Sequence, residues 1–161
     1  MLAKDSYPRR QLRRKSVNMK LRELKARKVV FARLYENEDL LDAVASASKQ
    51  ANISAGFFTI IGTLKKAKIG FYRDGNYEPI EMIKPLEIAS CIGNICLKEK
   101  APIAHAHIVV SDEKGQTFGG HVLPGCLISV TGELMLVEAA GMKLERKFDE
   151  KTKLYLLSFD E

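Results

Sequence analysis

The feature that most constrains this chain is an alternating run of side chains that contains two histidines. Residues 103–110 read Ile-Ala-His-Ala-His-Ile-Val-Val, and side chains two apart on a β-strand point to the same face of a sheet. His105 and His107 therefore share a face. The following Asp-Glu-Lys-Gly segment, residues 112–115, favours a type I turn closed by a left-handed glycine. The run predicts a strand that turns back on itself as a hairpin.

This hairpin carries the third and last histidine of the chain to the same face. If Asp112 pairs with Gln116, His107 lies directly opposite His121. Directly opposed Cβ atoms lie about 4.5–5.5 Å apart and diagonal pairs, such as His105 and His121, about 7–8 Å apart. Three imidazole ligands with one free position are typical of a catalytic or exchangeable zinc site. We predict that the three histidines bind one metal ion, with zinc as the expected metal; hydrogen bonds across a subunit interface or a metal-free polar pocket are the alternatives.

The composition describes a globular chain in a reducing compartment. The chain has 161 residues, of which 46% are hydrophobic, which is enough for one domain with an extension. Its three cysteines form no CxxC pair, so we expect buried free thiols. No apolar run reaches the roughly 18–20 residues that span a bilayer, and no hydrophobic stretch follows the N-terminal charges. We expect a cytoplasmic protein with no membrane partner.

The excess of positive over negative charge is confined to the N-terminal segment. Residues 1–28 contain 11 Lys or Arg against two acids and carry +9, whereas residues 29–161 contain 15 Lys or Arg against 18 acids and carry −3. We expect 1–28 to be a basic extension that attracts DNA or another polyanion and 29–161 to be the folded domain. A solvated tail, or residues upstream of a true start at Met19, are the alternatives. The expected phosphate contacts are Arg9, Arg10, Arg13, Arg14 and Lys15.

Hydrophobic periodicity predicts a strand-rich domain. Met19 to Lys28 fits a short helix, and a longer helix with Asn37 as its N-cap runs to about Ala51. Beyond residue 55 the chain is almost entirely strand-like, residues 141–146 fitting either a short helix or a strand. Seven or eight strands with one or two helices predict an α+β domain of two packed, largely antiparallel sheets, a sandwich.

Other catalytic motifs are missing from the sequence. There is no P-loop, GxGxxG or GxSxG, so the sequence gives no support to nucleotide-cradling or serine-hydrolase chemistry. Glu133, in the strand-like run 129–137, is a candidate fourth ligand or general base; an exposed strand carboxylate is its alternative interpretation.

Several of these stretches together resemble the PPC domain, which is conserved in plants and prokaryotes. The resemblance covers some four-fifths of the chain, from about Val29 to Phe159. It is carried by Glu-Asp-Leu-Leu at 38–41, AGFFTIIGTLKKA at 55–67, PLEIAS at 85–90, His-Ala-His at 105–107 and FGGHVLPGC at 118–126.

The resemblance implies an α+β sandwich that assembles as a homotrimer. In the family, the histidines that match His105, His107 and His121 cluster and hold a metal, commonly zinc, in some prokaryotic members. Plant relatives use the domain for self-association, while separate AT-hooks bind DNA. This chain has no AT-hook, and the plant signature Gly-Arg-Phe-Glu-Ile-Leu is present only as Leu86-Glu87-Ile88.

Two functional hypotheses follow. The first is a non-enzymatic, trimeric assembly or regulatory module with a three-histidine metal site, which associates with DNA through its basic extension. The second is a small zinc-dependent, hydrolase-type enzyme in which Glu133 is the base.

Overall fold

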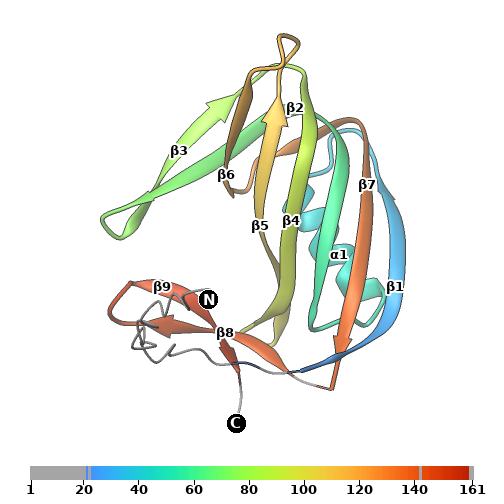
Figure 1. The fold of residues 1–161 in the computed structure, drawn as a ribbon, viewed down its shortest axis with the longest axis vertical. Coiled ribbons are helices and arrows are strands. Elements are labelled where there is room, and N and C mark those ends of the chain that lie inside the picture. The colour runs from blue at the N-terminus through green and yellow to red at the C-terminus, as the bar shows by residue number, and fades with distance from the viewer. Residues whose placement is uncertain (1–20, 22, 142, 160–161) are drawn as a thin grey trace, which may run out of the picture.

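The computed structural model describes residues 21, 23–141 and 143–159. In this part of the chain, strands dominate and one helix, α1 (Leu40–Gln50), packs against them (Figure 1). In chain order, the strands are β1 (Lys25–Leu34), β2 (Gly56–Arg73), β3 (Asn76–Met82), β4 (Leu86–Lys98), β5 (Ala101–Ser111), β6 (Thr117–Val122), β7 (Leu127–Ala140), β8 (Leu144–Asp149) and β9 (Leu154–Phe159).

All of these strands belong to one mixed sheet, in place of the two packed sheets expected from the sequence. Its order is β1-β7-β2-β6-β5-β4-β8-β9, with β3 paired to β2, and only the β4–β8 pair is parallel among the described strands. The long strand β2 is the physical reason. Its first half pairs with β7 and β4, and its second half pairs with β3 and β6, so a single strand serves both expected layers.

Gly62 marks an irregularity in β2, a few residues before its partners change. Its φ is 138°, and the registers of β2 against β4 and against β7 both shift there. A Cβ at this position would lie 2.2 Å from the carbonyl oxygen of Thr131, so only glycine fits. Because β2 also pairs with β6 beyond this point, the strands β2, β4, β5 and β6 form a closed circuit of pairings.

The helix begins at Leu40, two residues later than an Asn37 cap would place it. Asp39 is the actual N-cap, because its carboxylate accepts hydrogen bonds from the backbone N–H groups of Leu41 and Asp42. Asn37 instead occupies a left-handed turn with φ 73°. The expected C-terminal end is confirmed, since Ala51 is the C-cap.

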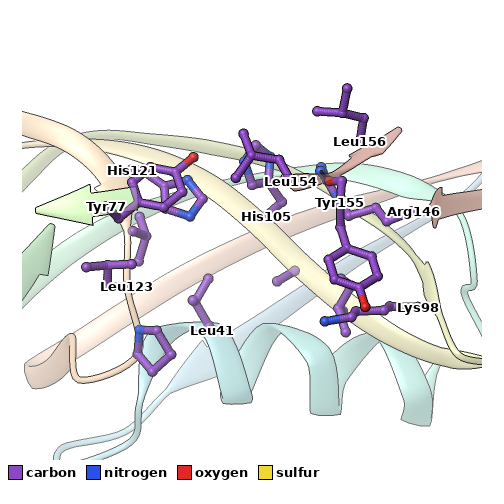
Figure 2. Close-up of a pocket in the computed structure, with 14 residues that line it drawn as sticks. Leu41, Tyr77, Lys98, His105, His121, Leu123, Arg146, Leu154, Tyr155 and Leu156 are labelled. Carbon is purple, nitrogen blue, oxygen red and sulfur yellow. Dashed lines mark hydrogen bonds between the residues drawn. The ribbon is translucent and has the colours of Figure 1, made fainter. Parts of the chain in front are cut away.

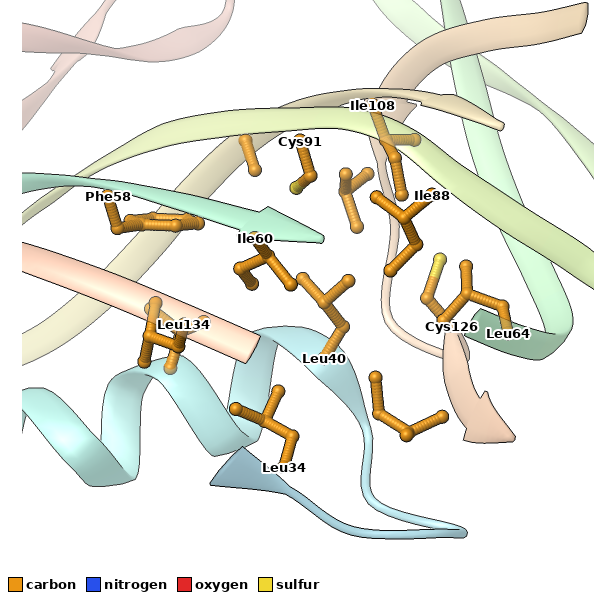
Figure 3. Packing of buried hydrophobic residues seen from close by; sticks show 14 of the residues in the cluster. Leu34, Leu40, Phe58, Ile60, Leu64, Ile88, Cys91, Ile108, Cys126 and Leu134 are labelled. Atoms are coloured by element: carbon orange, nitrogen blue, oxygen red, sulfur yellow. The ribbon is translucent and has the colours of Figure 1, made fainter. Parts of the chain in front are cut away.

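One face of the sheet packs on α1 and forms the core. Side chains from β2, β4, β5 and β7 meet Leu40 and Val44 of the helix there (Figure 3). The opposite face carries several large apolar side chains that are exposed in the single chain, among them Phe31 at 77% and Ile92 at 61%. The two faces therefore differ sharply in what covers them.

The two ends of the described chain differ from, or sharpen, the sequence interpretation. The segment expected to be a short helix is extended in its described part, because residues 25–28 lie in β1. Residues 144–149 form strand β8, which selects the strand alternative, and β9 pairs with it as a hairpin.

The three cysteines are free and buried, as predicted. No helix among the described residues is both long enough and apolar enough to cross a membrane.

Candidate metal centre

The hairpin formed by β5 and β6 has the register that the sequence predicts. Ser111 pairs with Thr117, and His107 lies directly opposite His121. The turn closes through a hydrogen bond from Asp112 N to Gln116 O at 3.0 Å. Gly115, with φ 73°, supplies the left-handed conformation that closes the loop.

The Asp112 carboxylate holds this turn together. It accepts hydrogen bonds from the backbone N–H groups of Lys114 and Gln116, both at 3.0 Å, and from Lys84 Nζ at 2.8 Å. The Lys84 hydrogen bond is the largest of the interactions that hold the pKa of Asp112 below its usual value. The register of the two histidine-bearing strands is thus fixed by a turn in which neighbouring groups satisfy the charged carboxylate of Asp112 with hydrogen bonds.

The three histidines converge on one point. Their ring centroids lie 5.6 Å apart for His105 and His107, 5.4 Å for His107 and His121, and 4.8 Å for His105 and His121. One nitrogen from each ring lies within 4.8 Å of the other two. Around a tetrahedral zinc ion with Zn–N bonds of about 2.0–2.1 Å, ligand nitrogens lie about 3.4 Å apart. Small rotations of the rings would close the remaining difference.

Burial keeps two of these rings in the form that binds metals. Burial is the largest influence that lowers the pKa of His105, to about 4, and the Arg146 charge adds to it. Burial is also the largest of the influences that lower the pKa of His121 to about 4, and the neighbouring His107 and Arg146 contribute smaller decreases. Metals bind the neutral imidazole, so both rings are available as ligands without first losing a proton.

One of the ring nitrogens has an unmet hydrogen-bonding need. The Nδ1 atom of His121 is buried and has no hydrogen-bond partner among the described residues. A buried polar atom without a partner costs free energy, and coordination of a metal is one way to satisfy a ring nitrogen. The donor set, its convergence and this nitrogen all fit a borderline metal such as zinc.

A pocket of about 430 Å³ adjoins the histidines. Tyr77 of β3 and His121 lie on one side of it, and Arg146, Tyr155 and Lys98 lie on the other (Figure 2). The Tyr77 ring stacks on the His121 ring with centroids 4.3 Å apart and planes 18° apart. The pocket lies beside the part of β5 that precedes its pairing with β6, where the β8–β9 hairpin supplies a wall.

The sequence interpretation missed the residues that line the far side of this pocket. Arg146 and Tyr155 come from the β8–β9 hairpin, and Lys98 comes from the end of β4. No motif marks them: Arg146 and Tyr155 lie more than twenty residues after His121, and Lys98, although close to His105 in the sequence, is on the preceding strand. Only the ambiguous strand pattern at 141–146 hinted at a structured element there.

The other predicted site residues are not brought to the histidines. Glu133 lies on β7, paired with Ile61 of β2, and the strands β2 and β4 separate it from β5. It lines separate hollows with Phe31 on the open face. The basic residues predicted to contact phosphates, Arg9, Arg10, Arg13, Arg14 and Lys15, lie outside the described residues.

The strand-rich fold and the histidine cluster define a class of small sheet domain with a potential metal centre. The family model of the Plants and Prokaryotes Conserved (PCC) domain, also written PPC, matches residues 21–140. The chain therefore belongs to this family, as the resemblance in the sequence predicted.

Solved structures of similar proteins agree with this assignment. A plant- and prokaryote-conserved protein from Pyrococcus horikoshii is 33% identical, with a TM-score of 0.79 over 89% of this chain and 98% of that chain. A metal-containing protein from Archaeoglobus fulgidus is 30% identical, with a TM-score of 0.80 over 89% of this chain and 100% of its own. A protein from Ralstonia eutropha JMP134, provisionally described as DNA-binding, is 28% identical, with a TM-score of 0.70 over 81% of this chain and 90% of its own.

A curated relative is much longer than this chain. The chain is 32% identical over 127 residues to the bifunctional protein GlmU of Synechococcus sp. strain JA-2-3B'a(2-13). The match spans 78% of this chain but only 19% of that protein. The chain thus spans about a fifth of the length of the curated relatives that it matches.

Proposed function

We propose that this protein is a metal-binding PCC module that acts by assembly and regulation, with zinc held by His105, His107 and His121. The observation that carries this proposal is the convergence of three imidazole nitrogens within 4.8 Å of one another. The metal-containing relative from Archaeoglobus fulgidus, 30% identical, supports it. A zinc ion here would act as a Lewis acid and would keep at least one position open for a ligand.

The metal content of the purified protein tests this proposal. The full chain, purified without a polyhistidine tag, is expected to contain about one zinc per chain by elemental analysis. His107→Ala should reduce this to below about 0.2 per chain, because two imidazoles do not complete the site. Thr117→Ala, on the same hairpin, is the matched control and should leave the zinc content unchanged. Low zinc in the parent protein, unaltered by His107→Ala, would remove the proposal.

We further propose a homotrimer, with the cytoplasm as its location. The open face of the sheet supports self-association, because Phe31, Ile61 and Ile92 are more than half exposed in the single chain. A contiguous exposed apolar face of this kind usually marks an interface. Ile61→Lys should dissociate the assembly, and light scattering after gel filtration measures its mass. Lys114→Glu, on the turn of the β5–β6 hairpin, should not change the mass. A monomeric parent protein would contradict this part of the proposal.

The basic extension is proposed to provide affinity for DNA. Residues 1–28 carry +9 while the remainder carries −3, so attraction to phosphates has to come mainly from the extension. The relative from Ralstonia eutropha, provisionally described as DNA-binding, is consistent with this role. Deletion of residues 1–18 should abolish salt-sensitive retention on a DNA column. Unchanged retention would reject the role of the extension.

A zinc-dependent, hydrolase-type enzyme is the second candidate. The observation that favours it is the pocket beside the histidines, since a catalytic metal needs a cavity in which a substrate can bind. Within one chain β2 and β4 separate Glu133 from the three histidines. This alternative therefore requires a base from a neighbouring copy or a different residue. Hydrolysis of chromogenic esters or phosphate esters by the zinc-loaded protein, lost in His107→Ala, would favour the enzyme.

A further inference from the structure

The pocket beside the histidines is built with positive charge on one side only. Arg146 and Lys98 line it, and no carboxylate is present among the described residues that line it. Neither cation has a carboxylate partner within ion-pairing distance in the described part of the chain. The positive charge of these two side chains is therefore not neutralised by an acid of the described chain.

Arg146 is oriented by two hydrogen bonds to neutral acceptors. Its Nη1 donates to the carbonyl oxygen of Tyr155 at 3.0 Å, and its Nη2 donates to Asn94 Oδ1 at 3.1 Å. Its Nε is buried and has no hydrogen-bond partner among the described residues. Two neutral acceptors thus orient the guanidinium without neutralising its charge.

Lys98 is positioned in a similar way. Its Nζ lies 3.8 Å from the centroid of the Tyr155 ring, a cation–π contact that holds the ammonium against the pocket wall without cancelling its charge. Tyr155 therefore orients both cations, Arg146 through its backbone carbonyl and Lys98 through its ring. A divalent metal on the three neutral histidines would add two further positive charges beside them.

The remaining wall of the pocket is apolar. Leu41, Leu123, Leu154 and Leu156 line it with Tyr77, which stacks on His121. The volume of about 430 Å³ falls in the range of small-molecule sites, about 300–1,000 Å³. A hydrogen bond from Tyr72 Oη of β2 to the carbonyl oxygen of Thr152 joins the β8–β9 turn to β2.

We propose that this pocket binds a small organic anion, with a carboxylate or phosphate on Arg146 and Lys98 and an apolar or aromatic body against Tyr77 and the leucines. The anion would balance the positive charge of the two side chains and of the ion on His105, His107 and His121. The inference rests on the proposed metal site for that last charge, whereas the pocket, its two cations and its apolar wall belong to the chain alone.

Calorimetric titration of the full-length protein with simple probes tests this inference. Benzoate and phenyl phosphate should bind the zinc-loaded protein, and benzamide, a neutral analogue of benzoate, should bind at least about tenfold more weakly. Inorganic phosphate, which has no apolar body, should bind more weakly than phenyl phosphate. If benzamide binds as tightly as benzoate, the anion site is wrong, and if inorganic phosphate matches phenyl phosphate, the apolar wall has no role.

Variants assign the binding to the two cations. Arg146→Gln should weaken binding of benzoate by about tenfold or more while the zinc content stays unchanged. Lys98→Met keeps the aliphatic stem over Tyr155, removes the charge and should also weaken binding, which provides a second test if Arg146→Gln unfolds. Lys151→Gln removes the same charge from the β8–β9 turn, outside the pocket, and should bind benzoate like the parent. Unchanged affinity in folded Arg146→Gln or Lys98→Met would overturn the inference.

The same titrations separate this inference from the metal proposal. If the parent protein contains zinc and binds none of the probes, the anion site fails and the metal site stands. If the parent protein contains no zinc and still binds benzoate through Arg146, the metal proposal fails and the pocket stands.

Discussion

The two hairpins that meet at the candidate site, β5–β6 and β8–β9, are held in the molecule in different ways. The β5–β6 hairpin is continuous with the core: Ile108 and Val110 are buried, and β5 pairs with β4 along its whole length. The β8–β9 hairpin joins the sheet through one parallel pair, Leu97 with Glu145, and most of its second strand is exposed.

This difference matches the different roles of the two hairpins. Metal ligands need fixed geometry, and the β5–β6 hairpin provides it through a closed turn and a buried strand. A wall that admits and releases a ligand is better made from a segment with few buried contacts, which is what the β8–β9 hairpin offers. The comparison predicts a rigid ligand-bearing hairpin and a more mobile wall, and the following experiments test it.

The largest expected effect is on global stability. Ile108→Ala removes a buried side chain from β5, and it should lower the free energy of unfolding by about 2–5 kcal/mol because it leaves a cavity. Leu156→Ala, in β9, removes a side chain that is 41% exposed and should cost less than about 1 kcal/mol. Chemical denaturation measures both. Equal losses would show that the two hairpins are equally part of the core.

Addition of zinc should stabilise the protein by an amount set by mass action. At a free zinc concentration 100-fold above the dissociation constant, the gain is about 2.7 kcal/mol. By hydrogen exchange, amides of β5 and β6 should gain protection on zinc binding, whereas amides of β8 and β9 should change less. The His107→Ala variant should show neither the stabilisation by zinc nor the gain in protection. Protection gained mainly in β8–β9 would place the metal elsewhere.

The turn of the β5–β6 hairpin should give a pH-dependent effect. Asp112→Asn removes the ion pair with Lys84 and should lower the melting temperature by a few degrees near neutral pH. The pKa of Asp112 is lowered in the folded protein, so its contribution is present above the unfolded value of 3.8 and is lost as the pH falls through the folded pKa. The melting temperatures of the two proteins should therefore converge as the pH falls from 3.8 through the lower pKa of the folded state. A constant difference across that range would show that the charge of Asp112 has no part in the effect.

The smallest expected effect concerns the tie between the pocket wall and β2. Tyr72→Phe removes the hydrogen bond to the Thr152 carbonyl and should accelerate hydrogen exchange in β8–β9 without changing the melting temperature measurably. Tyr35→Phe, at an exposed tyrosine outside the pocket, is the control. Faster exchange across β5–β6 in Tyr72→Phe would mean that the two hairpins are coupled.

Local chemistry explains why one hairpin could be predicted in detail. The alternation of residues 103–110 and the Asp-Glu-Lys-Gly turn are contiguous, so turn type and register follow from neighbouring residues, and the pairing of His107 with His121 is confirmed. The helix was predicted for the same reason, although its cap is Asp39. Asn37 was wrong as the cap because the choice between two polar residues that lie two positions apart depends on the turn that precedes the helix.

The parts that could not be predicted depend on long-range pairing. Nothing local in the sequence of β2 indicates that its halves pair with different strands. The sequence therefore predicted a sandwich, whereas the structure has one sheet with a closed circuit of strand pairings. The position of Arg146 could not be predicted either, because it depends on the pairing of β8 with β4, which lies some fifty residues earlier in the chain. The position of Glu133, away from the histidines, follows from the strand order and not from its own strand.

The sequence by itself determined the histidine-bearing hairpin, its register, the main helix and the segregation of positive charge into residues 1–28. Each of these depends on residues that are close together in the chain, where backbone geometry leaves few choices. The tertiary structure alone decided the single sheet, the pocket and the two uncompensated cations that face the histidines. Those features join segments far apart in sequence, and which distant strands pair depends on burial over the whole sheet.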